Sequence, residues 1–155
     1  MVVVIGASAT AVLQSADLAD ADVVVNERWA AGMASSLQLG LRNLQDTAAV
    51  AAIVMLVDQP FIQVAALQRL VSAWEAGALI AAAAFDGRVG NPVLFDRSVW
   101  DEAAESATGD RGARDLLRER AADVVAVDCD DVARPGDIDT PADYADARLI
   151  TRPPE

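Results

Sequence analysis

Acidic side chains in two segments are the residues of this sequence best suited to chemistry. Asp58 follows the apolar run in VMLVDQPFI, and Asp137 and Asp139 flank Ile138 in GDIDTPADYADARL. Mg²⁺ prefers oxygen ligands and often takes one or two carboxylates together with the phosphates of a substrate. If these two segments meet in the fold, their acids predict a Mg²⁺ site.

Asp58 also has a structural interpretation. Asp58 or Gln59 would cap the next helix, and Pro60 would then lie in the first turn of that helix. Capping residues followed by a proline are typical of helix starts. The sequence alone therefore leaves open whether Asp58 is a ligand or a cap.

The TPAD stretch is typical of a helix start. Thr140 would be the N-cap, Pro141 the first helical residue and Asp143 the third, an arrangement related to the capping box. This role does not account for Asp137 and Asp139, which lie just upstream. The two acids therefore stay candidate metal ligands.

A third segment, NERWAAGMASSLQLGL, leaves an apolar run and enters a helix. It passes through Gly32, and the helix is expected to start near Ser35 or Ser36. A helix amino terminus with small residues lets a ligand come close and offers it free N–H groups. In the structural alternative, Ser35 or Ser36 is an ordinary N-cap and Trp29 is a core residue.

Two further segments combine turn signals with polar side chains. In FDGRVGNPVLF the Asp-Gly pair predicts a hairpin between Phe85 and Pro92. TGDRGARDLLRER places Arg111 between two glycines ahead of a helix, and Arg114 near the start of that helix. This second segment is either an ordinary loop or an arginine-bearing loop that binds an anion.

Short apolar runs alternate with amphipathic stretches along the 155 residues. Strands are expected at residues 2–5, 23–25, 48–57, 79–85, 92–95 and 124–127. Helices are expected at residues 8–16, 33–44, 61–76, 98–104, 113–120 and 141–149. This alternation predicts a mainly parallel sheet covered on both faces, a three-layer Rossmann-like α/β/α sandwich. The length suits one domain over residues 1–150 with a tail at residues 151–155.

The composition excludes several kinds of site. The chain has no histidine and no lysine, which excludes histidine-ligated metals, histidine-based catalysis and a P-loop lysine. The net charge of −12 argues against nucleic acid and anionic membranes as partners. No apolar run approaches the roughly 20 residues of a membrane span. A single cysteine, Cys129, favours the reducing cytoplasm.

Taken together, these segments resemble the MobA-like NTP transferases, and among them the molybdenum-cofactor cytidylyltransferases. The matching stretches occur in the family's order: VVVNERWAAGMASSLQLGL, VMLVDQPFI, FDGRVGNPVLF, GDRGARDLL and DIDTPADY. The resemblance implies a fold of the nucleotide-diphospho-sugar transferase type. It also implies transfer of CMP or another NMP from an NTP, with CTP favoured, to the phosphate of a molybdopterin-type acceptor, with release of pyrophosphate.

The resemblance assigns roles to particular residues. Asp58 and Asp139 would be catalytic and would bind Mg²⁺, with Asp137 as the other member of the acid pair. The residues that would bind the nucleotide are Gly32, Ser35 and Ser36. Those that would bind the acceptor are Asn91, Pro92 and Arg111.

The sequence departs from the family at its start. Family members begin with a further strand and a glycine-rich loop that binds the triphosphate, and this chain has no counterpart of them. One alternative is therefore a catalytically inactive, split or truncated relative that acts as a binding or regulatory domain. The sheet edge left by the absent strand would favour a homodimer or a complementing partner chain. A second alternative is a related sugar-phosphate or phospholactate nucleotidyltransferase.

Overall fold

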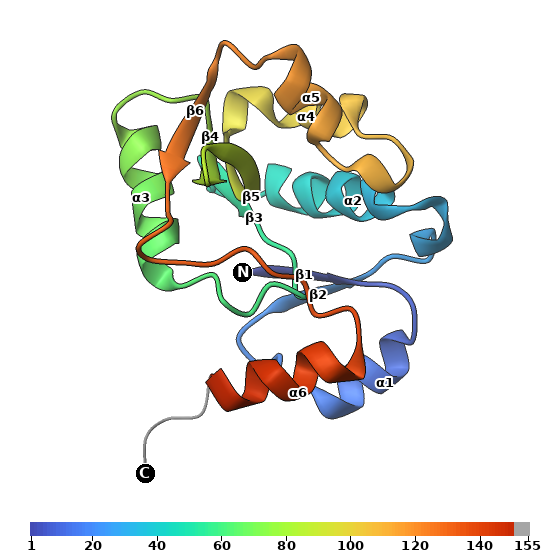
Figure 1. Cartoon of the computed structure of the whole chain (residues 1–155). Helices are drawn as coiled ribbons and strands as arrows, with labels where there is room; N and C mark the ends of the chain where they lie inside the picture. Colours follow the sequence, from blue (N-terminus) through green and yellow to red (C-terminus); the bar gives the residue numbers. More distant parts are fainter. Residues whose placement is uncertain (151–155) are drawn as a thin grey trace. The chain divides into compact units, whose positions relative to one another are not determined.

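Strands and helices alternate along the chain in the predicted order (Figure 1). The computed structural model describes residues 1–150 and the side chains of residues 1–147. The strands are β1 (Val2–Ile5), β2 (Asp22–Val25), β3 (Ala51–Val54), β4 (Ile80–Phe85), β5 (Arg88–Asp96) and β6 (Val124–Asp128). The helices are α1 (Ala9–Ser15), α2 (Met33–Gln45), α3 (Val64–Glu75), α4 (Trp100–Ser106), α5 (Arg114–Glu119) and α6 (Pro141–Ile150). Short 3-10 helices are η1 (Trp29–Ala31), η2 (Arg97–Val99) and η3 (Gly109–Arg111).

These elements make a mixed α/β fold of the Rossmann type, which confirms the predicted fold class. The chain forms two units. The first unit consists of Met1–Ala52 with Asp96–Asp123, and the second of residues 53–95 with residues 124 onward. The single domain over residues 1–150 stays a prediction. The predicted tail at residues 151–155 lies outside the described residues.

A parallel pair of strands forms the sheet of the first unit. β1 and β2 are paired along their whole length, Val2–Ile5 with Asp22–Val25. α2 packs against β1, and a Cβ atom added at Gly40 would lie 3.3 Å from Val4 Cγ2. α2 also packs against α4 and η3. This helix therefore packs against both the strand pair and the GDRGAR loop, residues 109–114.

Arg97 fixes the segment that follows α2. Its guanidinium donates hydrogen bonds to the carbonyl oxygens of Thr47 at 2.9 Å and Ala49 at 2.6 Å, and also to that of Gln45, the last residue of α2. The same group lies over the ring of Trp100, 5.1 Å from its centroid. Arginine near the end of a helix satisfies carbonyls that have no partner inside the helix.

β4 lies at the centre of the second unit. The strand order of its sheet is β3-β5-β4-β6, and β4 is antiparallel to β5 and parallel to β6. All residues of β4 are buried, and most of them are alanines. α3 packs against β4 and β6, and Ala66 and Leu70, one turn apart on α3, are fully buried. Small side chains on the central strand allow this helix to approach closely.

The hairpin between β4 and β5 confirms the prediction made from the Asp-Gly pair. Phe85 pairs with Arg88, so Asp86 and Gly87 form a two-residue turn. Both turn residues are left-handed, with φ of 49° and 71°, as a type I′ turn requires. β5 begins earlier than expected, at Arg88, because pairing starts directly after this turn.

Two element boundaries near Asp58 differ from the prediction. β3 ends at Val54, so Asp58 lies in a turn beyond the strand instead of closing it. α3 begins at Val64 with Gln63 as its N-cap. The interpretation of Asp58 or Gln59 as the cap of this helix is therefore wrong.

The start of α6 confirms the capping box. The N–H and hydroxyl of Thr140 donate to Asp143 Oδ2 at 2.8 and 2.7 Å, and the N–H of Asp143 donates to Thr140 Oγ1 at 3.2 Å. Pro141 is the first helical residue, as predicted. Because donors at the start of the helix find partners, the helix can begin directly after the acidic segment.

Within the described residues, no helix has the length and apolar character needed to cross a membrane.

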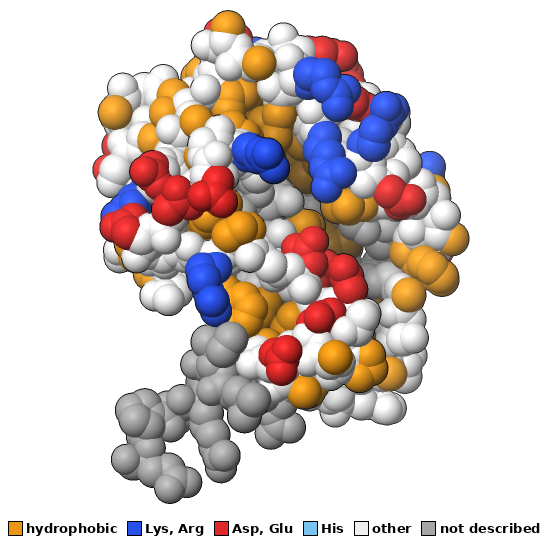
Figure 2. Space-filling view, in the orientation of Figure 1, with side chains coloured by type: hydrophobic (Ala, Val, Ile, Leu, Met, Phe, Trp, Pro, Cys, Tyr) orange, Lys and Arg blue, Asp and Glu red, His pale blue; other side chains and the backbone are white. Residues whose placement is uncertain are grey.

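The face drawn in Figure 2 exposes acidic side chains, arginines and hydrophobic side chains together.

Candidate functional site

Asp58 presents a buried, unpaired carboxylate oxygen in the second unit. Its Oδ1 atom accepts no hydrogen bond from any described residue. A buried polar atom without a partner costs about 1–3 kcal/mol, and more when it is charged. Because Asp58 does not cap α3, local structure gives no reason for this cost. A cation at Oδ1 would offset it.

The segment that carries the other two acids lies beside Asp58. The N–H of Ile138 donates to the carbonyl oxygen of Asp58 at 2.9 Å, and Gln59 Nε2 donates to Asp137 Oδ1 at 2.7 Å. The carboxylate of Asp139 has no hydrogen bond or ion pair with a described residue. The two acidic segments therefore meet in the fold, as the metal-site hypothesis requires.

Further contacts hold these two segments together. The guanidinium of Arg134 lies 4.9 Å from the centroid of the Phe61 ring. The Arg134 N–H donates to the Phe61 carbonyl at 3.5 Å. A Cβ atom added at Gly136 would lie 3.6 Å from the same ring. The position of the acids thus rests on ring packing as well as on hydrogen bonds.

The donor set fits a hard divalent cation with few protein ligands. The described part of the chain contains no group of three or more Asp, Glu, Cys or His side chains placed to hold a metal together. Mg²⁺ is usually bound by one or two carboxylates together with substrate phosphates and waters. The metal role of Asp58 with one acid of the Asp137 and Asp139 pair stays a prediction.

Asn91 and Pro92 lie in an irregular part of β5. The register between β4 and β5 shifts between Ala82 and Ala84, so β5 bulges there. The peptide bond between Asn91 and Pro92 is cis, and the side chain of Pro92 is fully buried. Asn91 is half-buried, and its amide has no hydrogen bond to a described residue. Bulges of this kind often lie beside active sites, and the acceptor role of both residues stays a prediction.

Asn26 organises the predicted nucleotide loop in the first unit. It follows β2 directly and is only 3% exposed. Its Nδ2 donates to Ser35 Oγ at 2.8 Å and to Ser36 Oγ at 2.9 Å, while its Oδ1 accepts from the Arg28 N–H at 2.9 Å. Ser35 Oγ lies 2.8 Å from the carbonyl oxygen of Gly32, to which it donates. The three predicted nucleotide residues thus belong to one hydrogen-bonded network at the start of α2.

The start of α2 differs from the structural alternative drawn from the sequence. α2 begins at Met33 and its N-cap is Gly32, so neither Ser35 nor Ser36 is an N-cap. Trp29 is 51% exposed and is not a core residue. Helix capping therefore does not account for Ser35 and Ser36, and core burial does not account for Trp29.

The GDRGAR loop reaches the start of α2. Asp110 Oδ1 accepts a hydrogen bond from the N–H of Met33 at 3.2 Å. Gly32 has a φ of 102°, and a Cβ atom added there would lie 2.5 Å from the carbonyl carbon of Gly109. Only glycine allows this close approach without strain.

Arg111 lies in the same loop and has local partners. Its Nε is 3.1 Å from Asp115 Oδ2, and its Nη2 donates to Thr108 Oγ1 at 2.8 Å. Its contact with an acceptor or a phosphate stays a prediction. The predicted site residues divide between the units: the first unit carries Gly32, Ser35, Ser36 and Arg111, and the second carries Asp58, Asn91, Pro92, Asp137 and Asp139.

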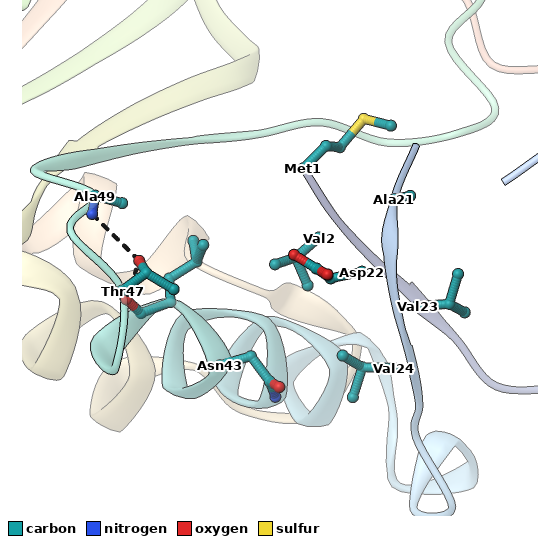
Figure 3. A pocket seen from close by; sticks show the side chains of 10 residues that line it. Met1, Val2, Ala21, Asp22, Val23, Val24, Asn43, Thr47 and Ala49 are labelled. Atoms are coloured by element: carbon teal, nitrogen blue, oxygen red, sulfur yellow. Dashed lines mark hydrogen bonds between the residues drawn. The ribbon is translucent and has the colours of Figure 1, made fainter. Parts of the chain in front are cut away.

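The first unit has cavities at both ends of its strands. A cavity of about 700 Å³ lies at the amino ends of β1 and β2 and is lined by Met1, Val2, Asp22 and Thr47, among others (Figure 3). Ligands of parallel α/β folds bind outside the carboxyl ends of the strands, so this cavity lies at the opposite edge. A smaller cavity of about 260 Å³ lies at the carboxyl end of β2, beside Asn26.

The comparison with known families assigns the chain. The model of the MobA-like NTP transferase domain matches residues 1–124. The chain belongs to the MobA-like NTP transferase family. This membership agrees with the resemblance of its ordered motifs and with its Rossmann-type fold.

Relatives of this MobA-like chain carry different names. Nicotine blue oxidoreductase of Paenarthrobacter nicotinovorans is 36% identical over 149 residues, which cover 90% of this chain and 71% of that protein. The structure of Rv0371c of Mycobacterium tuberculosis H37Rv in complex with manganese matches with a TM-score of 0.77 and 30% identity, covering 94% of this chain and 74% of that one. Molybdopterin-guanine dinucleotide biosynthesis protein A of Archaeoglobus fulgidus matches with a TM-score of 0.66 and 21% identity, covering 96% and 77%. The last comparison shows likeness of fold only.

The sequence analysis did not predict the contacts of some residues that shape the site. Asn26 follows a strand directly, and this position was a usable signal. Gln59 is the neighbour of Asp58, but its bond to Asp137 depends on distant residues meeting. The hydrogen bond that Asp110 accepts at the start of α2 was not predictable from local sequence, because its partner Met33 lies 77 residues away.

Proposed function

We propose that this MobA-like chain is a cytoplasmic, Mg²⁺-dependent nucleotidyltransferase that transfers CMP from CTP to the phosphate of a molybdopterin-type acceptor. The observation that supports this most strongly is the buried, unpaired Oδ1 of Asp58, with the segment of Asp137 and Asp139 bonded beside it. The manganese complex of the related Rv0371c structure supports a divalent cation in this family.

The proposed reaction exchanges one bond at phosphorus for another. A phosphate oxygen of the acceptor attacks the α-phosphorus of CTP, and the bond from this phosphorus to the oxygen that bridges to the β-phosphate breaks. CMP becomes joined to the acceptor, and pyrophosphate leaves with the electron pair of the broken bond. Such transfers need positioning and neutralisation of charge more than covalent help from the protein.

The side chains would divide this work. Asp58 and Asp139 would hold the cation, with Asp137 as the alternative to Asp139. A bound Mg²⁺ would supply polarisation of the α-phosphate and offset the charge on the phosphates. Asn26 would keep the nucleotide loop in one conformation. The unpaired amide of Asn91 would orient the acceptor.

Release of pyrophosphate from CTP in the presence of a molybdopterin acceptor tests this proposal. We expect release with Mg²⁺, none with EDTA, and a loss of about 100-fold or more in Asp58→Asn. The matched control is Asp146→Asn, because Asp146 is an exposed acid on α6 that has no partner among the described residues. No release with CTP, GTP or ATP would overturn the proposal.

Two alternatives within the family are separated by changing the ligand. Absence of CTP binding in calorimetry with Mg²⁺ would indicate the inactive or split relative, and clear binding of CTP would count against it. Turnover with a sugar phosphate or a phospholactate in place of the molybdopterin acceptor would indicate the related transferases. A loss of turnover in Asp58→Asn would be expected for these transferases too, so only the acceptor distinguishes them.

A second candidate function is an oxidoreductase. The 36% identity to a protein named nicotine blue oxidoreductase favours it. Redox chemistry of this kind requires a cofactor that carries electrons, such as a reduced nicotinamide dinucleotide. Incubation of the chain with nicotine blue and this cofactor tests this function, and the change in absorbance of the mixture measures turnover. Turnover in EDTA that is unaffected by Asp58→Asn would support the oxidoreductase over the transferase.

A further inference from the structure

β1 is an apolar strand with an unpaired edge. Among the described residues its only strand partner is β2, on one side. Its sequence is VVVI, yet only Ile5 is buried, and the three valines are half-buried. β4, which lies between two strands, is buried along its whole length. Because strands of parallel sheets are normally buried on both faces, β1 exposes more apolar surface than a parallel strand usually does.

The unpaired edge of β1 presents backbone groups that pair with nothing. The carbonyl oxygen of Ile5 accepts a hydrogen bond from the N–H of Asn26 at 2.7 Å, on the side of β2. Backbone groups of successive strand residues point to opposite sides, so Val2 and Val4 direct theirs away from β2. Within the described part of the chain, no strand lies on that side to accept or donate.

β1 also lacks the features that protect a sheet edge. Protected edges carry charged side chains, prolines or bulges, or are covered by other segments. β1 contains no charge and no proline, and it pairs with β2 without a bulge. The cavity of about 700 Å³, and not a covering segment, borders its amino end. Such an edge is suited to pairing with a further strand.

Two fixed walls bound this cavity. Met1 and Val2 lie on one side of it, and Thr47 and Ala49 lie on the other (Figure 3). Arg97 holds the second wall, because its guanidinium donates to the carbonyl oxygens of both Thr47 and Ala49. The packing of α2 against β1 holds the first wall. The gap is therefore a formed feature of the first unit.

The lining of the cavity favours a polypeptide over a small molecule. Asp22 is the charged side chain among the lining residues, and most of the others are apolar. The side chains of Asn43 and Thr47 already donate to the carbonyl oxygens of Leu39 and Leu44, at 2.9 and 2.6 Å. Small-molecule sites use convergent polar groups that fix the ligand. Here the unused donors and acceptors are those of the β1 backbone, which an extended peptide matches.

Charge and length favour another polypeptide over a second copy of this chain. Each chain carries a net charge of −12, which opposes self-association. The chain spans 71% of nicotine blue oxidoreductase and 74% of the Rv0371c structure with manganese. Both relatives therefore contain segments that have no counterpart among these 155 residues.

We propose that the free edge of β1 and the adjoining cavity bind an extended, mainly apolar segment of another polypeptide, which pairs with β1 as a third strand. The segment is uncharged or basic where it passes Asp22. The surface uses neither Asp58 nor a metal, and it lies at the amino ends of the strands. It therefore stands or fails independently of the proposed function.

Titration of the whole chain with synthetic peptides tests this surface. Overlapping peptides would span the residues of nicotine blue oxidoreductase that lie outside its match to this chain. Calorimetry should detect binding of at least one peptide and of none of the scrambled versions. The bound peptide should slow hydrogen exchange of the Val4 amide about tenfold or more, because this N–H gains a partner. The amide of Val25, which faces the opposite edge of the pair, should be unaffected, and NMR measures both.

Val2→Pro removes an N–H from the free edge of β1 that the pairing with β2 does not use. We expect the affinity for the peptide to fall about tenfold or more. Val25→Pro is the matched control, because it removes an N–H from the other edge of the strand pair and its side chain does not line this cavity. Its affinity should equal that of the unmodified chain. Circular dichroism of both variants checks that they fold.

Absence of binding by every peptide, or equal affinity of Val2→Pro and the unmodified chain, overturns the proposal. A dimer detected by light scattering without peptide, and lost in Val2→Pro, would assign the edge to a second copy and overturn it as well. Exchange at Val4 that the peptide leaves unchanged has the same meaning. This last measurement uses the unmodified chain, so it decides the matter even if Val2→Pro does not fold.

Discussion

Asp58 shows what a single residue reveals only in three dimensions. An acid after an apolar run suits a ligand and a helix cap equally, so the sequence left both roles open. The structure excludes the role of helix cap, because α3 begins at Val64 and takes Gln63 as its N-cap. It also shows that Oδ1 is buried and unpaired, a property that depends on how distant segments pack. Sequence patterns carry no information on such burial.

Replacing Asp58 by asparagine should stabilise the metal-free fold. Removal of the charge on a half-buried carboxylate whose Oδ1 atom is buried and unpaired should raise the free energy of unfolding by roughly 1 kcal/mol. Mg²⁺ should raise the melting temperature of the unmodified chain but not that of Asp58→Asn, because a ligand stabilises only the state that binds it. Thermal unfolding with EDTA and with Mg²⁺ measures both effects. Asp146→Asn is the control and should behave as the unmodified chain. Strong destabilisation of Asp58→Asn in EDTA would instead assign Asp58 a structural role.

At the scale of elements, local signals gave the correct types of structure and distant contacts set their ends. The Asp-Gly turn and the capping box of Thr140 are local, and both predictions are confirmed. The alanine-rich β4 also forms as predicted, although alanine favours helices, because the strand lies between two others. The predicted end of β3 and start of α3 were wrong. The Asp58 carbonyl there bonds to Ile138, a contact that no local pattern encodes.

Gly32 joins two elements and should not tolerate a side chain. Gly32→Ala would place a Cβ atom 2.5 Å from the carbonyl carbon of Gly109, at a φ of 102°. Gly77→Ala is a matched control, because Gly77 has a φ of 105° and no atom within 4 Å of its added Cβ. Backbone strain should cost each variant about 1–2 kcal/mol, and the overlap should cost Gly32→Ala more. Urea unfolding measures the difference. Equal losses would show that the GDRGAR loop moves aside freely.

The capping box of α6 should contribute stability in a pH-dependent way. Hydrogen bonds from the Thr140 side chain, and then from backbone N–H groups, lower the pKa of Asp143. A lowered pKa in the folded state means that the stabilisation is present above the pKa of the unfolded chain, about 3.9, and is lost as the pH falls through the folded value. The free energy of unfolding of the unmodified chain should therefore be higher than that of Asp143→Asn at about pH 7. This difference should vanish near about pH 2. Urea unfolding at both pH values measures it, and Asp146→Asn, on the same helix, should show little difference at either pH. A difference that persists at low pH would contradict the role of the carboxylate.

At the scale of the whole molecule, negative charge exceeds positive charge by 12. The ion pairs of the described residues include exposed ones, such as Arg69 with Asp131 at 2.6 Å, where the side chains are 37% and 68% exposed. Such pairs contribute about 0–1 kcal/mol each. Arginines and acids share the face drawn in Figure 2, but there are too few arginines to pair with all the acids. Repulsion among the excess carboxylates is then the larger electrostatic effect.

Salt should therefore stabilise the chain. Between about 10 mM and about 100 mM NaCl the screening length falls from about 30 Å to about 10 Å, which weakens repulsion spread over the molecule more than contacts between adjacent charges. We expect the melting temperature to rise over this range in EDTA, which excludes metal binding as the cause. The rise should disappear near the isoelectric point of about 4.2, because the net charge that drives it is then close to zero. A melting temperature that falls with salt at neutral pH would mean that the ion pairs outweigh the repulsion.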